Sequence, residues 1–379
     1  MIAGNQAEAA GTVLLAGGGH AHVGVLADWI RRGPPAAGRR VLLTPEPTLR
    51  YSGMLPGWLA GQHSADDGLI DLAALAARAG AELVLDRCAA LDPAARMVTT
   101  AGGRALAFDI ASFDTGGEGR GAGLIGSDPR LIEVRPIDAF VAHMADLRAS
   151  GRALARIVVA GGGAGGVEIA FGLRNMVQAA PQPEVALVTG AGGLLPGFSD
   201  RVRKRVAAAL ARQGIAVIAA KARFASGTLV ADGQSLEPAQ LVVAATGSAA
   251  PAWVRASGIA TDADGFIAVD ARQCSTSHPH ILAAGDVATR TDRPLARSGV
   301  HAVFAGEVLA ANLRSLIAGE VPQAAYRPRR HSLYMINTGD GRAIASYGPL
   351  VAEGRRVLAW KHMIDKRWIM KYAALARGA

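Results

Sequence analysis

The stretch ARIVVAGGGAGGVEIAFGLRNMV, residues 155–177, decides the fold. It opens with an apolar run typical of a buried parallel strand, and its end has apolar residues at helical spacing. Between them stand Gly161, Gly163 and Gly166, the complete GxGxxG spacing, with Ala164 opening the helix. Glycines here let the backbone approach a pyrophosphate, and the following helix directs its amide groups at the anion. The stretch therefore predicts a Rossmann-like dinucleotide-binding unit.

A second copy of this unit begins with LLAGGGHAHV, residues 14–23. Gly17 and Gly19 precede Gly161 and Gly163 by 144 residues, but His22 stands where the third glycine belongs. A histidine there predicts a displaced helix or an outward-turned side chain. His20 and His22 are spaced i, i+2 and have no Cys, Asp or Glu companions, so we expect no metal site. Contact with a cofactor and simple packing both stay open for these histidines.

Size and composition favour a globular α/β protein of two or three domains. The chain has 379 residues, half of them hydrophobic, 19% charged and 47 of them glycine, and its mean hydropathy is +0.23. We find no uninterrupted apolar run of membrane-spanning length and no signal peptide in the opening MIAGNQAEAAG. Cys88 and Cys274 are the two cysteines, which excludes a disulfide scaffold and a local dithiol pair. A long-range pair stays open.

The positive charge is concentrated at the C-terminal end. Residues 326–379 hold eleven Lys and Arg against three acidic residues, while the net charge of the whole chain is +9. Such an asymmetry indicates a basic surface for an anionic lipid, polyanion or partner, or else a solvated basic tail. No recognised motif supports nucleic-acid binding.

Two further glycine turns follow predicted strands. LVVAATGS, residues 241–248, ends with Thr246 and Gly247, and ILAAGDVA, residues 281–288, ends with Gly285 and Asp286. A carboxylate at a strand end, with backbone amides beside it, can hold a ribityl hydroxyl and lie next to a pyrophosphate. The competing interpretation of Asp286 is a helix N-cap.

The order of these motifs resembles that of flavoproteins with two dinucleotide-binding domains, the pyridine nucleotide-disulfide oxidoreductase superfamily. GGGHAHV, YSGMLPGWLAG, FDIASFDTGG, LYMINTGDGRAIASYGP and WKHMIDKRWIMKY resemble, more narrowly, a subfamily similar to type II NADH dehydrogenases and associated with selenophosphate synthetase. The resemblance implies two Rossmann-like domains that bind FAD and NAD(P)H. It divides the chain into 1–117 and 253–325 for the FAD domain, 118–252 for the NAD(P) domain and 326–379 as a C-terminal segment with a basic helix.

The resemblance also implies roles for single residues. Gly17, Gly19 and the amides around His20 and Ala21 would bind the FAD pyrophosphate, and Asp286 the ribitol. Further positions implied at the FAD site are Thr44 at the adenosine ribose, Cys88 at the adenine, Ser52, Met54 and Pro56 beside the isoalloxazine, Thr115 and Gly116 near the pyrophosphate, and Val300 and His301 at the flavin's pyrimidine end. Gly161, Gly163 and Gly166 would hold the nicotinamide cofactor. Glu168 would lie at the nicotinamide–flavin contact, unless it is only a partly buried helix acid with a local partner.

The resemblance implies an FAD-dependent oxidoreductase that takes hydride from NAD(P)H. Because no CxxxxC exists, electrons would leave the flavin directly for a quinone or another small acceptor. In the second unit the second strand ends at Thr189 without an acid, and no arginine follows closely to hold a 2′-phosphate, so the choice between NADH and NADPH stays open. The alternative function is a flavin-bearing accessory or redox-sensing partner in selenium metabolism with little turnover.

The last helix bears on location and partners. Trp360, Ile364, Trp368, Tyr372 and Leu375 follow helical spacing among basic residues, which predicts an interfacial helix. Packing under the flavin domain and a homodimer or selenophosphate synthetase surface are the alternatives. We expect a cytoplasmic protein, with peripheral contact on the inner face of the membrane as the alternative.

Overall fold

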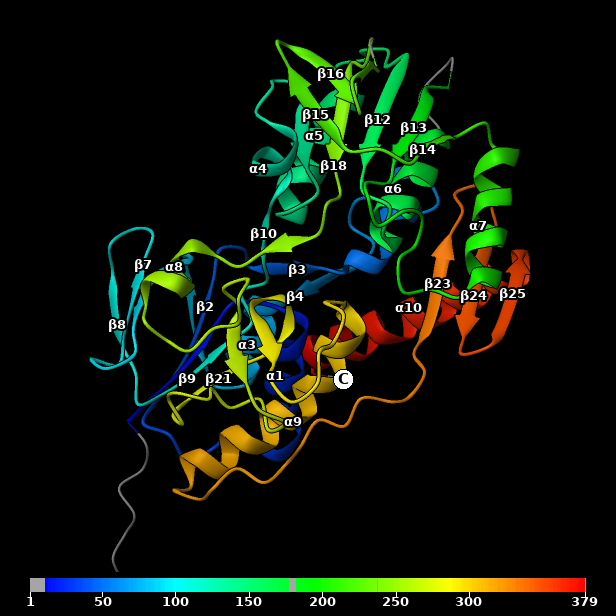
Figure 1. Ribbon diagram of the computed structural model, residues 1–379. Helices are drawn as coiled ribbons and strands as arrows, with labels where there is room; N and C mark the ends of the chain where they lie inside the picture. The colour runs from blue at the N-terminus through cyan, green and yellow to red at the C-terminus, as the bar shows by residue number, and fades with distance from the viewer. Residues whose placement is uncertain (1–10, 177–181, 237, 379) are drawn as a thin grey trace, which may run out of the picture.

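Two parallel five-stranded sheets form the frame of the protein, shown as a computed structural model in Figure 1. The structure describes residues 11–176, 182–236 and 238–378. The first sheet has the order β21-β9-β1-β2-β5 and the second the order β11-β18-β12-β13-β14. Their strands are β1 (Thr12–Ala16), β2 (Arg39–Thr44), β5 (Glu82–Leu85), β9 (Ile110–Phe113) and β21 (Ile281–Ala283), and β11 (Leu131–Glu133), β12 (Arg156–Ala160), β13 (Glu184–Val188), β14 (Ala216–Ile218) and β18 (Leu241–Ala244). The predicted α/β class with two Rossmann-like units is confirmed.

Each sheet is built on a strand–glycine–helix unit. β1 runs into α1 (His20–Arg32), and β12 runs into α6 (Ala164–Arg174). The central strands are apolar and almost wholly buried, as expected for sheets covered on both faces. α9 (Gly299–Ile317) packs on α1, where a side chain on Gly24 would come within 3.3 Å of Gly306. By length and composition α9 could cross a membrane, but 44% of its most apolar stretch is buried inside the protein.

The remaining helices cover these sheets or connect them. They are α2 (Leu55–Leu59), α3 (Leu72–Arg78), α4 (Gly121–Ile125), α5 (Ile137–Ala149), α7 (Asp200–Arg212) and α8 (Ala252–Ala256), with the 3-10 turns Ser52–Met54 and Gly285–Val287. GLIDLAALAARAG, residues 68–80, has apolar residues at helical spacing, but only Leu72–Arg78 is helical, because Leu69–Asp71 pairs with Thr48–Arg50 as a strand before α3 begins. The Asp71 side chain caps α3 by accepting the N–H of Ala74.

Small antiparallel sheets complete the two halves of the molecule, of which the first is built on the β1 sheet and the second on the β12 sheet. They are formed by β3 (Thr48–Arg50) and β4 (Leu69–Asp71); by β6 (Cys88–Asp92), β7 (Met97–Thr100) and β8 (Ala105–Ala107); by β15 (Ala222–Ala225), β16 (Thr228–Ala231) and β17 (Gln234–Ser235); and by β23 (Leu333–Asn337), β24 (Ala343–Tyr347) and β25 (Leu350–Gly354). The chain passes between the halves at β10 (Glu118–Gly119) and β19 (Ser248–Ala249), which pair antiparallel. β20 (Ile267–Val269) pairs parallel with β22 (Ala288–Arg290).

The C-terminal helix α10 (Arg355–Arg377) contacts both parts of the molecule. It leaves the β23–β25 sheet, which touches α6 and α7, and continues to α3 and α1 of the first half (Figure 1). Trp368, Tyr372 and Leu375 pack into the core around Trp29. The predicted interfacial face is therefore wrong for these three residues, because it lies under the first half. The face that α10 exposes instead carries Trp360, Met363 and Met370.

Candidate active site

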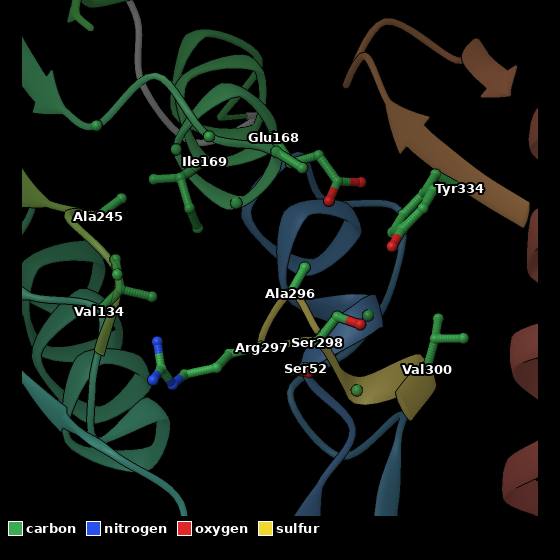
Figure 2. Close-up of a pocket in the computed structure, with 18 of the residues that line it drawn as sticks. Ser52, Val134, Glu168, Ile169, Ala245, Ala296, Arg297, Ser298, Val300 and Tyr334 are labelled. Carbon is green, nitrogen blue, oxygen red and sulfur yellow. The ribbon is translucent and has the colours of Figure 1, made fainter. Parts of the chain in front are cut away.

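A cavity of about 1470 Å³ lies between the two halves and α10. Its wall combines the second glycine loop, the segment 51–56 of the first half, the segment 296–300 at the start of α9, and Lys361, Asp365 and Trp368 of α10. Figure 2 shows the Glu168 carboxylate and the Tyr334 ring facing one space, with Arg297 and Ser298 on the opposite side. Its wall thus combines segments that are far apart in the sequence.

The second glycine loop, residues 161–166, opens into this cavity. Gly161 has φ +140°, and a side chain on it would meet the carbonyl oxygen of Ala245 at 2.2 Å. Gly166 is equally restricted by the Gly161 carbonyl at 2.0 Å, whereas Gly163 and Gly165 have nothing within 4 Å of a Cβ position. Gly163 caps α6. The loop therefore presents free backbone at a helix N-terminus, and a nucleotide pyrophosphate fits it.

The first glycine loop, residues 17–22, has the same frame but is filled. A side chain on Gly17 would meet the Asp114 carbonyl at 2.3 Å, and one on Gly19 would meet the Asp114 carboxylate at 2.3 Å. That carboxylate accepts the N–H groups of Ala21 at 2.7 Å and His22 at 3.2 Å. The loop thus already holds one anion, and a pyrophosphate fits there in place of it.

His22 is a packed core residue. Its side chain is fully buried, so the expected outward turn is wrong. Nδ1 lies 2.6 Å from the carbonyl oxygen of Gly17, which only accepts, so Nδ1 carries the proton and Nε2 accepts from the Ser112 hydroxyl at 2.8 Å. Burial lowers the pKa of His22 to about 4. Both ring nitrogens are used, and the side chain is not left for a cofactor.

His20 lies among aromatic rings at the start of α1. Its ring centroid is 5.7 Å from that of Tyr51 and 5.3 Å from that of Trp368 on α10. Its Nε2 is buried and makes no hydrogen bond within the described chain. Burial, with Arg135 nearby, lowers the pKa of His20 to about 4. The ring is therefore neutral, and one polar atom remains for a ligand.

Glu168 on α6 is anchored by the C-terminal sheet. Its Oε1 accepts the N–H of Asn337 on β23 at 2.8 Å. Burial raises the pKa of Glu168 to about 7, and the positive charge of Lys361 opposes this rise. Asn337 is the local partner that a purely structural acid would have. The Glu168 carboxyl group also borders the cavity, however, and can change its charge near neutral pH.

Lys361 and Asp365 form a buried ion pair at the cavity wall, and neither residue was among the predicted site residues. Lys361 Nζ lies 2.7 Å from Asp365 Oδ2 and donates to the carbonyl oxygen of Gly53 at 2.8 Å. Tyr51 donates its hydroxyl to Asp365 Oδ1 at 3.3 Å. Burial, with Asp365 beside it, raises the pKa of Tyr51. The i, i+4 spacing was the available signal, but it was hidden in a generally basic helix.

Asp286 faces the first loop from the opposite side and reaches the second half. Its Oδ2 lies 2.7 Å from Arg135, so this ion pair joins the two halves, as does the pair of Arg50 with Asp138. Asp286 belongs to a 3-10 turn with Gly285, and it lines a small cavity with His301. His301 Nδ1 is hydrogen-bonded to Tyr326 at 2.7 Å, whereas Val300 faces the large cavity. α9 begins at Gly299, just before Val300 and His301.

The structure brings only part of the predicted site to the large cavity. Ser52, Pro56, Gly161, Gly163, Ala164, Gly166, Glu168, Thr246, Gly247 and Val300 line it. The other predicted residues are not on its wall: Gly17, Gly19, His20, Ala21, His22, Thr44, Met54, Cys88, Thr115, Gly116, Gly285, Asp286 and His301. Thr44 is buried against Gly18, and Cys88 packs in β6 with its thiol near the Ala90 carbonyl.

Comparisons with known proteins identify the family and the fold. Residues 11–306 match the family model described as pyridine nucleotide-disulphide oxidoreductase. No curated protein sequence matches the chain. The structure is similar to sulfide:quinone oxidoreductase from the hyperthermophilic bacterium Aquifex aeolicus, with 17% identity, TM-score 0.78, and coverage of 97% of this chain and 92% of that one.

Two further solved structures show the same fold. NAD-dependent persulfide reductase from A. fulgidus is 21% identical over 89% of this chain and 64% of its own, with TM-score 0.72. The water-forming NADH oxidase from Lactobacillus brevis, bound to NADH, is 17% identical over 89% and 75%, with TM-score 0.69. At these identities the likeness describes the fold. The family model spans most of the chain, and the protein belongs to the pyridine nucleotide-disulphide oxidoreductase family, whose members are FAD-containing, NAD(P)H-dependent oxidoreductases.

Proposed function

We propose that the protein is an FAD-dependent oxidoreductase that takes hydride from NAD(P)H and passes electrons directly to a quinone or another small acceptor. The observation that carries this proposal is the single cavity joining the open second loop to segments 51–56 and 296–300 of the first half. A nicotinamide cofactor on the second loop would extend its reactive end toward these segments. Bound FAD would supply the hydride-accepting ring.

The residues of the cavity wall would position the donor and manage a proton. Gly161, Gly163 and the start of α6 would bind the donor's pyrophosphate. Glu168, with a pKa of about 7, can hold or release a proton at its carboxyl group at neutral pH, next to the charge of Lys361. The Lys361–Asp365 pair would orient Gly53 and Tyr51 at the other side of the cavity.

Neither cysteine supports an electron route through a disulfide. Cys88 is buried in β6 and Cys274 lies near Arg272, and neither lines the cavity. Burial raises the pKa of each thiol to about 12, so neither is a thiolate at neutral pH. Direct transfer to an acceptor in the cavity is therefore the simpler route.

A donor's adenosine end would lie near the end of β13. Thr189 there donates toward the Ile218 carbonyl, and Lys221 lines the cavity with Thr189 and Gly190. A lysine at this place would interact with the 2′-phosphate of NADPH. We therefore expect NADPH to serve at least as well as NADH, and Lys221→Ala to weaken NADPH selectively.

Anaerobic mixing of the FAD-loaded protein with NADH or NADPH tests the proposed function. We expect the flavin absorption band to bleach when the donor is mixed with the protein, because each flavin takes up one hydride. The band should return when a short-chain quinone is added. Protein mixed with the quinone alone is the control and should show no change. An FAD-loaded protein that bleaches with neither donor would rule out the nicotinamide cofactor as substrate.

The exposed face of α10 supports contact with an anionic membrane surface. Trp360, Met363 and Met370 are 44%, 49% and 55% exposed, and the exposed Lys366, Arg367 and Lys371 lie among them. Apolar and basic residues on one helix face suit the lipid interface, where a quinone would be found. The sequence-based interpretation of an interfacial helix thus moves to a different face. The association with selenophosphate synthetase stays a prediction from resemblance.

Vesicle sedimentation tests this membrane contact. We expect the full chain to pellet with vesicles containing phosphatidylglycerol and not with phosphatidylcholine vesicles. The variant Trp360→Ser/Met363→Ser/Met370→Ser should pellet several-fold less. Equal binding of both forms would contradict the proposal for this face.

A further inference from the structure

Asp114 occupies a position where the second half carries an alanine. It follows β9 and precedes Thr115 and Gly116, as Ala245 follows β18 and precedes Thr246 and Gly247. The two residues are equivalent in space as well, because Gly17 lies against the Asp114 backbone as Gly161 lies against the Ala245 backbone. The two halves therefore differ by a carboxyl group at the same point of the loop.

The Asp114 carboxylate fills the space in front of α1. Oδ2 accepts the N–H groups of Ala21 and His22, and a side chain on Gly285 would meet Oδ1 at 2.2 Å. Its side chain is only 3% exposed. These amide groups are the ones that a dinucleotide pyrophosphate would use in such a loop. Ligand and carboxylate therefore compete for one anion site.

No cation pairs with Asp114 among the described residues. From α1 it faces the backbone of Ala21 and His22, and the His22 ring, with a pKa of about 4, is neutral above pH 5. From the turn after β21 it faces Asp286, whose charge is paired with Arg135. Burial, opposed by the two amide groups, raises the pKa of Asp114 to about 7. Asp114 can therefore bind a proton near neutral pH.

We propose that FAD binds the first loop with Asp114 protonated, so that cofactor binding takes up one proton from solution. This inference rests on the proposed flavin site. An ionised Asp114 would put a third negative charge beside the two of the pyrophosphate in a buried space. A neutral carboxyl group yields the amides to the phosphate and can donate its O–H to a phosphate oxygen.

FAD titration of the apoprotein between pH 6 and 9 tests the proposal. We expect a constant Kd below about pH 7 and a rise of about tenfold per pH unit above it, as for one linked proton. Calorimetry at pH 8 in phosphate and in Tris buffer should give an uptake of about 0.9 proton per FAD, from the difference in buffer ionisation enthalpy.

Two variants isolate Asp114. Asp114→Asn keeps an acceptor for the Ala21 amide and should bind FAD with a Kd that varies less than threefold over this range, with no proton uptake. Asp109→Asn removes a half-exposed carboxylate just before the same strand and should behave like the wild type. Both variants retain Glu168, so its titration cannot produce the difference.

The outcomes separate this inference from the proposed function. Wild-type FAD binding that is tight but independent of pH, without proton uptake, overturns the role of Asp114 and leaves the proposed function standing. Failure of wild type and Asp114→Asn to bind FAD at any pH removes both. If Asp114→Asn does not fold, the wild-type calorimetry alone decides.

Discussion

The two glycine loops have the same backbone frame, but the first is filled by a side chain and the second is open. Gly17 and Gly161 both have positive φ and both lie against the strand-end backbone that follows in their sheet. The first loop is closed by the Asp114 carboxylate and by His22, whereas the second is open to the large cavity. The comparison teaches that the residue at the neighbouring strand end, rather than the number of glycines, determines whether the amide groups of a loop already have a hydrogen-bond partner before a ligand binds.

Giving the first loop the third glycine of the second should have the largest effect. His22→Gly leaves the Gly17 carbonyl and the Ser112 hydroxyl without their partners and creates a cavity in the core. We expect a loss of about 3–5 kcal/mol in the free energy of unfolding, measured by urea denaturation. His143→Ala on the exposed side of α5 is the control, with a change within about 0.5 kcal/mol. A loss below 1 kcal/mol for His22→Gly would show that the ring does not support the first loop.

Giving the second loop the carboxylate of the first should close it. Ala245→Asp places an acid where its oxygen can reach the amides at the start of α6, as Asp114 does at α1. We expect the Kd for NAD(P)H to rise about 100-fold, which corresponds to about 3 kcal/mol. Ala245→Asn matches the volume without the charge, and equal weakening by both variants would assign the effect to space alone. Stopped-flow flavin bleaching against donor concentration measures it.

Replacing Glu168 by a neutral residue should change the free energy of unfolding by an amount that depends on pH. Its pKa is about 7 in the folded protein and ordinary when unfolded, so the folded form holds the proton more tightly. Its contribution to stability is therefore complete at low pH and is lost as the pH rises from about 4.5 to 7. Glu168→Gln should match wild type at pH 5 and exceed it at pH 8 by about 1–2 kcal/mol, a value reduced because water reaches the cavity.

Denaturant titrations at the two pH values measure this difference. Gln keeps an oxygen to accept the Asn337 N–H, so the contact with β23 is retained. A stability difference that does not change between pH 5 and 8 would mean that Glu168 is ionised throughout.

The smallest effect is expected for the cysteines, both of which belong to the first half. Cys274→Ser breaks any pairing with Cys88 and lies outside the cavity. Flavin reduction and reoxidation rates should stay within about twofold of wild type. A large loss of reoxidation rate would instead indicate electron transfer through a thiol.

The sequence was sufficient for the fold because its signals are local. Each loop, strand and helix of the two units lies within about thirty residues, and the apolar runs identify the buried strands. The closed state of the first loop was not predictable in this way. Asp114 stands in the quoted FDIASFDTGG, but its partners Ala21 and His22 are more than ninety residues away. Only the assembled sheet brings them together.

The same reason explains the error at the C-terminal helix. Spacing alone grouped Trp368 with Trp360, but Trp368 stacks on Tyr51 with ring centroids 4.7 Å apart, more than three hundred residues away in sequence. That contact rotates the predicted face inward and leaves Trp360, Met363 and Met370 outside. Periodicity identifies an amphipathic helix but does not say which of two mixed faces finds a partner.

The path of α10 has a consequence for protein preparation. Removing residues 355–379 to improve solubility would take away Lys361, Asp365 and Trp368, which form one wall of the cavity, and would uncover the core around Trp29. A protein without these residues would therefore be both less soluble and inactive. Its behaviour with vesicles would not test whether α10 contacts a membrane. Surface substitutions on the outer side of this helix are the appropriate way to obtain a tractable sample.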